Sequence, residues 1–82
     1  MTLRKSLINS QPKVGELIKE IRILTSLTQE QLAVHLGVTY STVNRWENGR
    51  GKPSPLAMWR IEEMLQGMDS AGQDLLVKYL SN

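Results

Sequence analysis

Apolar residues near the start of the chain recur at the spacing of a helix. Five of them fall at i, i+3, i+4, i+7 and i+10, namely Val14, Leu17, Ile18, Ile21 and Leu24. Residues at this spacing share one face of a helix, because the helix turns once in about 3.6 residues. The pattern therefore predicts an amphipathic helix over 13–25.

Capping signals then indicate two short helices in the middle of the chain. Thr28, with Gln31 three residues later, has the form of a capping box. Gly37 suits the left-handed residue that commonly ends a helix, and Thr39 is the next N-cap candidate. The second of these helices is expected over 40–48, where an Asn-Gly pair closes it.

Two more helices are expected after a proline-containing loop. Ser54 with Pro55 predicts the start of one, and Ser70 with Gln73 has the form of a second capping box. Their apolar positions are Leu56, Met58, Ile61, Met64, Leu65, Met68, Leu75, Leu76, Tyr79 and Leu80. No segment alternates with a period of two for long enough to favour a strand. The predicted fold class is all-α, a compact bundle of five helices.

The chain of 82 residues has the length of one small domain. Residues 1–11 are polar with isolated apolar positions, and we expect a flexible or partly ordered N-terminal arm there. The domain itself is expected over 12–82. The apolar runs are too short to span a membrane, and the first residues lack the apolar core of a signal peptide. These features favour a cytoplasmic protein.

Composition argues against several kinds of site. The chain has no cysteine and one histidine, His35, so neither a disulfide framework nor a zinc site is expected. No glycine-rich phosphate loop and no pair of nucleophile and base stand out. We expect no cofactor and no enzymatic activity.

Charge is divided unequally along the chain. Residues 1–52 hold eight basic side chains and four acidic ones, whereas residues 53–82 hold two basic and four acidic ones. The net charges of these parts are +4 and −2. This asymmetry indicates an anionic partner for the first part, although ordinary surface charge explains the same count.

The two central helices are separated by so short a turn that they must cross steeply. Ala33 is small where the helices would meet, and Gly37 takes the turn. Val38, Val43 and Trp46 complete the apolar side. This is the arrangement of a helix-turn-helix over 28–48, whose second helix can enter the major groove of DNA.

The stretch TQEQLAVHLGVTYSTVNRWENGRGKPSP resembles the phage-repressor-like Cro/Xre family. The spacing Ala33–Gly37–Val43 and the ending W-E-N-G-R-x-x-P carry the resemblance, which extends from about Val14 to Met68. It implies a lambda-repressor-like fold. It also implies a transcription regulator, such as a repressor, that binds a DNA operator.

A helical wheel assigns the outward face of helix 40–48 to DNA. Val43 and Trp46 fall on its inner arc, whereas the outward arc holds Tyr40, Ser41, Asn44 and Arg45. The family resemblance implies base contacts for the first two of these and for Arg45. Arg45 can span the O6 and N7 acceptors of guanine or bind a phosphate. Tyr40 can meet a thymine methyl or a phosphate, and Asn44 an adenine edge or the backbone.

Four residues are candidates for phosphate contacts. Gln29 resembles the family's phosphate-binding glutamine at the start of a helix, where free N–H groups attract anions. Arg50 and Lys52 resemble its basic loop along the sugar–phosphate backbone. Thr42 could bind a phosphate or make a local bond with the cap Thr39.

Arg22 and Glu47 are expected to form a structural ion pair. The wheel places Glu47 beside the inner residue Val43, where a carboxylate would be partly buried. The family pattern places an arginine of the first helix against this glutamate, at the position of Arg22. We interpret the pair as orienting helix 40–48, since a lone buried charge would be costly.

Double-stranded DNA is the expected partner. A unit of this size covers few base pairs, so we expect a homodimer on a palindromic site. Its interface could come from the last helix or from the Met68 end of the fourth, although these residues serve equally well to close the monomer's own core. An alternative function is an antitoxin of the same fold, which would bind a toxin protein and its own promoter.

Overall fold

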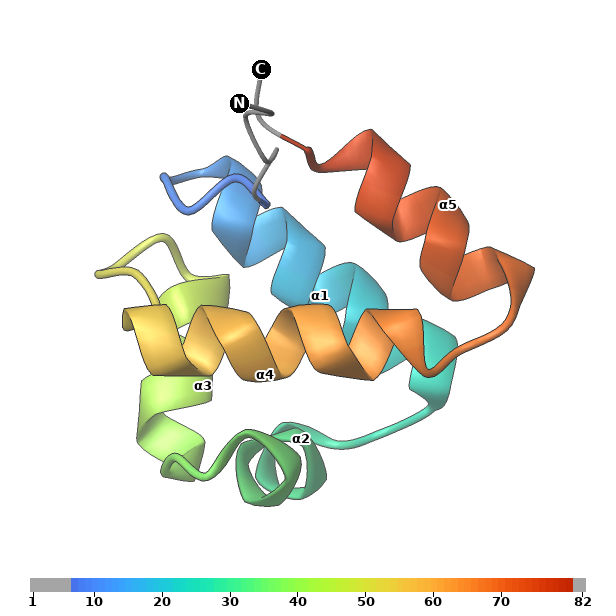
Figure 1. Cartoon of the computed structure of the whole chain (residues 1–82). Coiled ribbons are helices and arrows are strands. Elements are labelled where there is room, and N and C mark those ends of the chain that lie inside the picture. The colour runs from blue at the N-terminus through green and yellow to red at the C-terminus, as the bar shows by residue number, and fades with distance from the viewer. Residues whose placement is uncertain (1–6, 81–82) are drawn as a thin grey trace.

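The computed structural model describes residues 7–80, and this part of the chain contains five α-helices (Figure 1). They are α1 (Lys13–Thr25), α2 (Gln29–Leu36), α3 (Tyr40–Glu47), α4 (Pro55–Gln66) and α5 (Ser70–Lys78). Over the described range the chain forms no strand, and one isolated antiparallel bridge joins Leu7 to Leu80. The prediction of an all-α bundle of five helices is confirmed.

Three of the predicted N-caps are present. Thr28 and Gln31 form a reciprocal capping box, in which each side-chain oxygen accepts from the other residue's backbone N–H at 3.1 and 2.9 Å. Thr39 caps α3, and Ser54 caps α4 by accepting from Ala57 N–H at 3.2 Å. These bonds satisfy N–H groups that have no partner inside the helix.

The predicted cap of α5 is wrong by one residue. The N-cap is Asp69, whose Oδ1 accepts from Ala71 N–H at 3.1 Å, and Ser70 is the first residue of the helix. Both residue types cap helices well. The carboxylate of Asp69 has the further advantage of a negative charge at the positive end of the helix.

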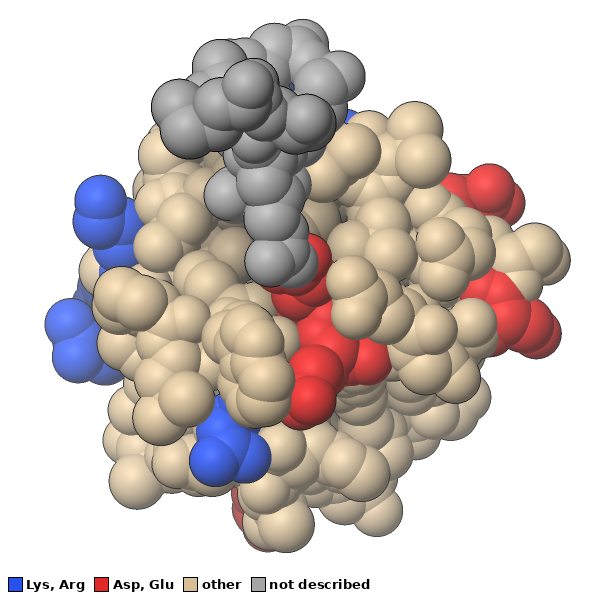
Figure 2. Space-filling view, viewed as in Figure 1, with Lys and Arg blue, Asp and Glu red and all other residues tan. Residues whose placement is uncertain are grey.

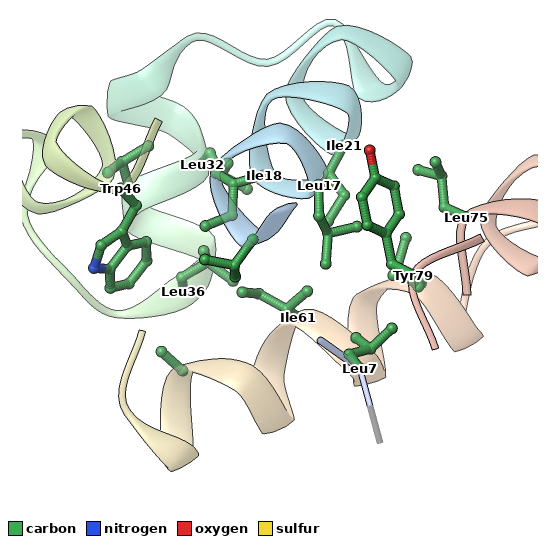
Figure 3. Packing of buried hydrophobic residues seen from close by; sticks show 14 of the residues in the cluster. Leu7, Leu17, Ile18, Ile21, Leu32, Leu36, Trp46, Ile61, Leu75 and Tyr79 are labelled. Atoms are coloured by element: carbon green, nitrogen blue, oxygen red, sulfur yellow. The ribbon is translucent and has the colours of Figure 1, made fainter. Parts of the chain in front are cut away.

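The hydrophobic core takes side chains from all five helices and from residues before α1. Figure 3 shows Leu17, Ile18 and Ile21 of α1 in the middle of this cluster. Trp46 lies on one side of them and Tyr79 on the other, so the core extends from the central helix pair to the end of the described chain. Helix α1 thus packs against both α3 and α5, while α4 packs against α2 and α5.

The last helix contributes to the domain's own core, which was one of the two roles considered for it. Leu75 is 8% exposed and Tyr79 is 3% exposed, whereas Leu76 and Leu80 are half-buried. None of the helices in the described part is long and apolar enough to cross a membrane.

The described part of the expected N-terminal arm lies against the domain. Leu7 is buried at 6% exposure, and Ile8 N–H donates to the carbonyl of Tyr79 at 2.7 Å. Residues 7–11 therefore connect the start of the described chain to the end of α5 and lead into α1. The rest of the expected arm over 1–11, residues 1–6, lies outside the described residues.

Candidate nucleic-acid interface

Helices α2 and α3 are joined by residues 37–39 alone. Gly37 has φ of 71°, the left-handed conformation that glycine adopts without steric cost, as the sequence predicted. Its N–H donates to Val34 O at 3.2 Å, and Val38 N–H donates to Ala33 O at 3.0 Å. The turn therefore closes on the last carbonyls of α2 and sets α3 directly against it.

The first turn of α3 is held by a cluster of hydroxyl groups. Thr39 Oγ1 accepts from Thr42 N–H at 3.2 Å. The same oxygen lies 2.8 Å from Thr42 Oγ1 and 3.2 Å from Ser41 Oγ, both within hydrogen-bond distance. Thr42 makes the local bond with its cap that was one of the two roles considered for it.

The two faces of α3 differ sharply in exposure. Val43 is fully buried and Trp46 is 6% exposed, so these two side chains attach the helix to the core. Ser41 and Arg45 are exposed, and Tyr40 is 50% exposed. The outward face that the helical wheel assigned to DNA is therefore largely open to solvent, with Asn44 as its half-buried member.

Asn44 connects α3 to the start of α2. Its Nδ2 donates to Gln29 Oε1 at 3.2 Å, and its Oδ1 accepts from Asn48 Nδ2 at 3.0 Å. This chain of three amides links the first residue of α2 to the second turn of α3 and to its C-cap, Asn48. Asn44 is thus held more firmly than Arg45, although the sequence placed both on the same arc.

Arg22 and Glu47 form a two-pronged ion pair between α1 and α3. Arg22 Nε donates to Glu47 Oε2 at 2.8 Å, and Arg22 Nη2 donates to Oε1 at 3.0 Å. The side chain of Glu47 is 3% exposed and that of Arg22 is 24% exposed. The hydrogen bond to Glu47 raises the pKa of Arg22 above its ordinary value. The pair fixes the last residue of α3 against the last turn of α1.

A glycine-containing loop carries two cations from the end of α3. Gly49 and Gly51 have φ of 77° and 83°, which L side chains rarely adopt. Arg50 N–H donates to Arg45 O at 2.8 Å, so the loop folds back onto the helix. Arg50 and Lys52 are exposed, which leaves both positive charges available to a partner.

Two amides before α1 also hold this loop, and the sequence analysis missed them. Gln11 Nε2 donates to Trp46 O at 3.0 Å and to Gly51 O at 2.6 Å. Asn9 Nδ2 donates to Pro53 O at 3.1 Å. The partners lie 35 to 44 positions apart in the chain and accept through backbone carbonyls. Only the alternation of amides in NSQ could have drawn attention to them.

Gly15 permits the close approach that these contacts need. A Cβ atom at this position would lie 2.5 Å from Trp46 O and 2.9 Å from Gln11 Oε1. Gly15 N–H donates to the same Oε1 at 3.2 Å. The first turn of α1, the amide of Gln11 and the end of α3 therefore meet at one point.

On the face shown in Figure 2, most basic and most acidic side chains lie on different sides. In Figure 2 most of the visible basic side chains project at the left and below, on the side where Figure 1 places α3 and the loop that follows it. Most of the visible acidic side chains lie at the centre and right, and one shows at the lower edge, near α2. On the face shown, α3 and the loop after it therefore lie on the more basic side, which suits an anionic partner.

No group of three or more histidine or acidic side chains suited to a metal ion occurs among residues 7–80. His35 is exposed on α2 and lines an open hollow with Arg60, Glu63 and Met64. The amides, hydroxyls and guanidinium groups around α3 are therefore the chemistry that this surface offers.

Comparison with known proteins identifies the same region. The family described as "Helix-turn-helix" matches residues 18–69. A protein of Bacillus subtilis (strain 168), described as an uncharacterized HTH-type transcriptional regulator, RghRB, is 36% identical over 53 residues. That match covers 63% of this chain and 38% of the relative's length. No solved structure matches with significance. Because the family match covers most of the chain and includes both helices of the pair, the chain belongs to the Cro/Xre-like helix-turn-helix family.

Proposed function

We propose that the protein is a sequence-specific regulator of transcription that binds double-stranded DNA and inserts α3 into the major groove of an operator. One observation carries this proposal. Two buried side chains, Val43 and Trp46, attach α3 to the core, while its opposite face is exposed beside the basic loop. A helix held in this way presents polar groups where base edges offer donors and acceptors.

Arg45 is the residue that we assign most directly to a base. It is exposed, and its planar guanidinium can donate two parallel hydrogen bonds to O6 and N7 of guanine. Tyr40 and Ser41 lie on the first turn, the part of a recognition helix that contacts bases. We assign Asn44 a base contact as well, and its bonds to Gln29 and Asn48 would fix the angle from which it approaches.

We assign phosphate contacts to residues around the exposed face of α3. Gln29 stands at the N-terminus of α2, where unpaired N–H groups favour an anion. Its Oε1 accepts from Asn44, which leaves the amide NH₂ to donate to a phosphate. Arg50 and Lys52 supply positive charge from the loop, and Thr42 can add its hydroxyl from the first turn of α3.

A second copy of the chain completes the proposed mode of binding. Helix α3 has eight residues, and such a helix reaches only a few base pairs. Two copies related by a two-fold axis would contact two half-sites about 10 base pairs apart. Occupation of such an operator would regulate transcription by blocking or recruiting polymerase.

Selection from a randomised DNA library tests this function. We expect the full chain to enrich a palindromic sequence whose half-site centres lie about 10 base pairs apart. The mass of the complex, measured in the same buffer, should correspond to two chains per duplex. A library from which no sequence is enriched would contradict sequence-specific binding. One enriched half-site bound by one chain would retain the DNA contact and contradict the dimer.

A further inference from the structure

The loop over 49–53 is held from outside the helix-turn-helix by two neutral amides. We propose that Asn9 and Gln11 are positioning residues of the DNA interface, which hold this loop so that Arg50 and Lys52 face the sugar–phosphate backbone. The inference rests on the proposed function, because a loop can be positioned for DNA only if this surface binds DNA.

Gln11 uses all of its amide group in this role. Its Nε2 donates to two carbonyls, Trp46 O at 3.0 Å and Gly51 O at 2.6 Å. Its Oε1 accepts from Gly15 N–H at 3.2 Å, which orients the amide. One side chain therefore ties the start of α1 to the end of α3 and to the tip of the loop.

Asn9 adds a second point of attachment. Its Nδ2 donates to Pro53 O at 3.1 Å, so that Asn9 and Gln11 bind the carbonyls of Pro53 and Gly51. Lys52 lies between these two carbonyls in the chain, and Arg50 precedes the first. The backbone on both sides of Lys52 is thus fixed by residues that precede α1.

Such fixation matters because the loop is rich in glycine. Gly49 and Gly51 both have positive φ, and glycine loses more conformational freedom than any other residue when it is ordered. A loop that is already ordered in the free protein avoids this entropic cost when its cations meet phosphates. The Asn9 and Gln11 amide groups donate to carbonyls of the chain itself, so we expect their effect on DNA binding to act through the position of Arg50 and Lys52.

The test compares Gln11→Met with Gln73→Met as a matched control. Gln73 is exposed on α5, on the acidic side of the molecule. Binding to the selected operator is measured over a range of salt concentrations. Gln11→Met should weaken binding roughly three- to tenfold and reduce the salt slope by about one, because cations that lose their position release fewer counterions. Gln73→Met should change neither quantity, and both variants should keep the wild-type ranking of mismatched operators.

A double-mutant cycle separates positioning from a general effect on folding. In a background of Arg50→Gln with Lys52→Gln, the loss caused by Gln11→Met should largely disappear, because the residues through which it acts are absent. An undiminished loss in that background, or a salt slope equal to that of the wild type, would overturn the proposal. Asn9→Ala is measured in the same cycle, and it replaces Gln11→Met as the test if Gln11→Met does not fold. Failure of the wild-type chain to bind any DNA would instead overturn the proposed function.

Discussion

At the scale of single residues, α3 divides its side chains between attachment to the core and an exposed outward face. The helical wheel placed Val43 and Trp46 inward, and both are buried. It placed Asn44 and Arg45 on one outward arc, yet Asn44 is half-buried in a chain of amides and Arg45 is exposed. Sequence spacing alone predicts the direction in which a side chain points from a helix. It does not predict how close that side chain lies to a residue of another helix. The contact with Gln29 of α2 is what distinguishes Asn44 from Arg45.

The exposed guanidinium of Arg45 leads to a prediction about base preference. Arg45→Ala should cost about 1–3 kcal/mol of binding free energy and relax the preference at one or two base pairs. Arg45→Lys is the matched control, because it keeps the charge and loses the planar fork. We expect it to recover part of the affinity and none of the preference. Equal losses on all sequences, measured by competition with single-mismatch operators, would assign Arg45 to a phosphate.

At the scale of elements, local sequence signals predicted a helix N-terminus correctly where only one residue was suited to cap it. The apolar spacing predicted α1 over 13–25, as observed, and Thr28, Thr39 and Ser54 cap the helices that they were expected to cap. The start of α5 was missed because two good capping residues, Asp69 and Ser70, are adjacent in the chain. Sequence alone does not decide which of two neighbouring caps takes the extended backbone.

Packing between α1 and α3 combines close contact with an ion pair. Gly15 lets the end of α3 approach the first turn of α1. Two turns later in α1, Arg22 binds the carboxylate of Glu47 through both Nε and Nη2. The ion pair was expected from the family resemblance. The contact at Gly15 was not, because a glycine inside a helix has no sequence pattern that reveals its neighbour.

Removal of Arg22 should therefore destabilise the domain. Arg22→Met leaves the carboxylate of Glu47 buried without its partner, since that side chain is only 3% exposed. We expect a loss of about 2–4 kcal/mol, near the lower end for buried pairs because Arg22 itself is partly exposed. In a domain of this size this lowers the melting temperature by roughly 10 °C or more. Thermal unfolding followed by circular dichroism measures the effect.

The double variant Arg22→Met with Glu47→Leu is the control for this prediction. It removes both charges and restores an apolar contact, so it should regain most of the lost stability. In Arg22→Met, the difference in binding free energy between matched and mismatched operators should change by less than the free energy of unfolding does. A variant that keeps its melting temperature but alters base preference would show that the pair acts on DNA contacts rather than on the packing of α3.

At the scale of the whole molecule, α5 closes the domain through contacts that join distant parts of the chain. The isolated bridge between Leu7 and Leu80 brings residues before α1 beside the end of α5. Glu20 on α1 accepts from the Tyr79 hydroxyl, and Lys78 Nζ donates to both of its carboxylate oxygens at 3.0 and 3.2 Å. The periodicity of the chain predicted the helices that meet here. It could not predict their pairing, because these partners are 58 and 59 positions apart.

This cluster should make stability fall on both sides of neutral pH. The hydrogen bond from Tyr79, opposed in part by burial and aided by Lys78, lowers the pKa of Glu20 below its ordinary value of about 4.5. A group with a lowered pKa in the folded state stabilises it above the ordinary pKa, and this contribution is lost as the pH falls. Burial, followed by the bond to Glu20, raises the pKa of Tyr79. Its contribution is therefore present below about pH 10 and is lost as the pH rises further.

Denaturant unfolding at a series of pH values measures the free energy of unfolding in the wild type and two variants. We call its fall at low pH the acid limb and its fall at high pH the alkaline limb. Glu20→Gln should be less stable than the wild type near pH 7 and should lose stability less steeply below pH 4.5, because the carboxylate that titrates there is absent. Tyr79→Phe should flatten the alkaline limb above about pH 10 and weaken the acid limb, since it removes the hydroxyl that titrates and that Glu20 accepts from. An acid limb as steep in Glu20→Gln as in the wild type would assign that limb to other carboxylates. An unchanged loss of stability above pH 10 in Tyr79→Phe would assign that loss to other groups that titrate there.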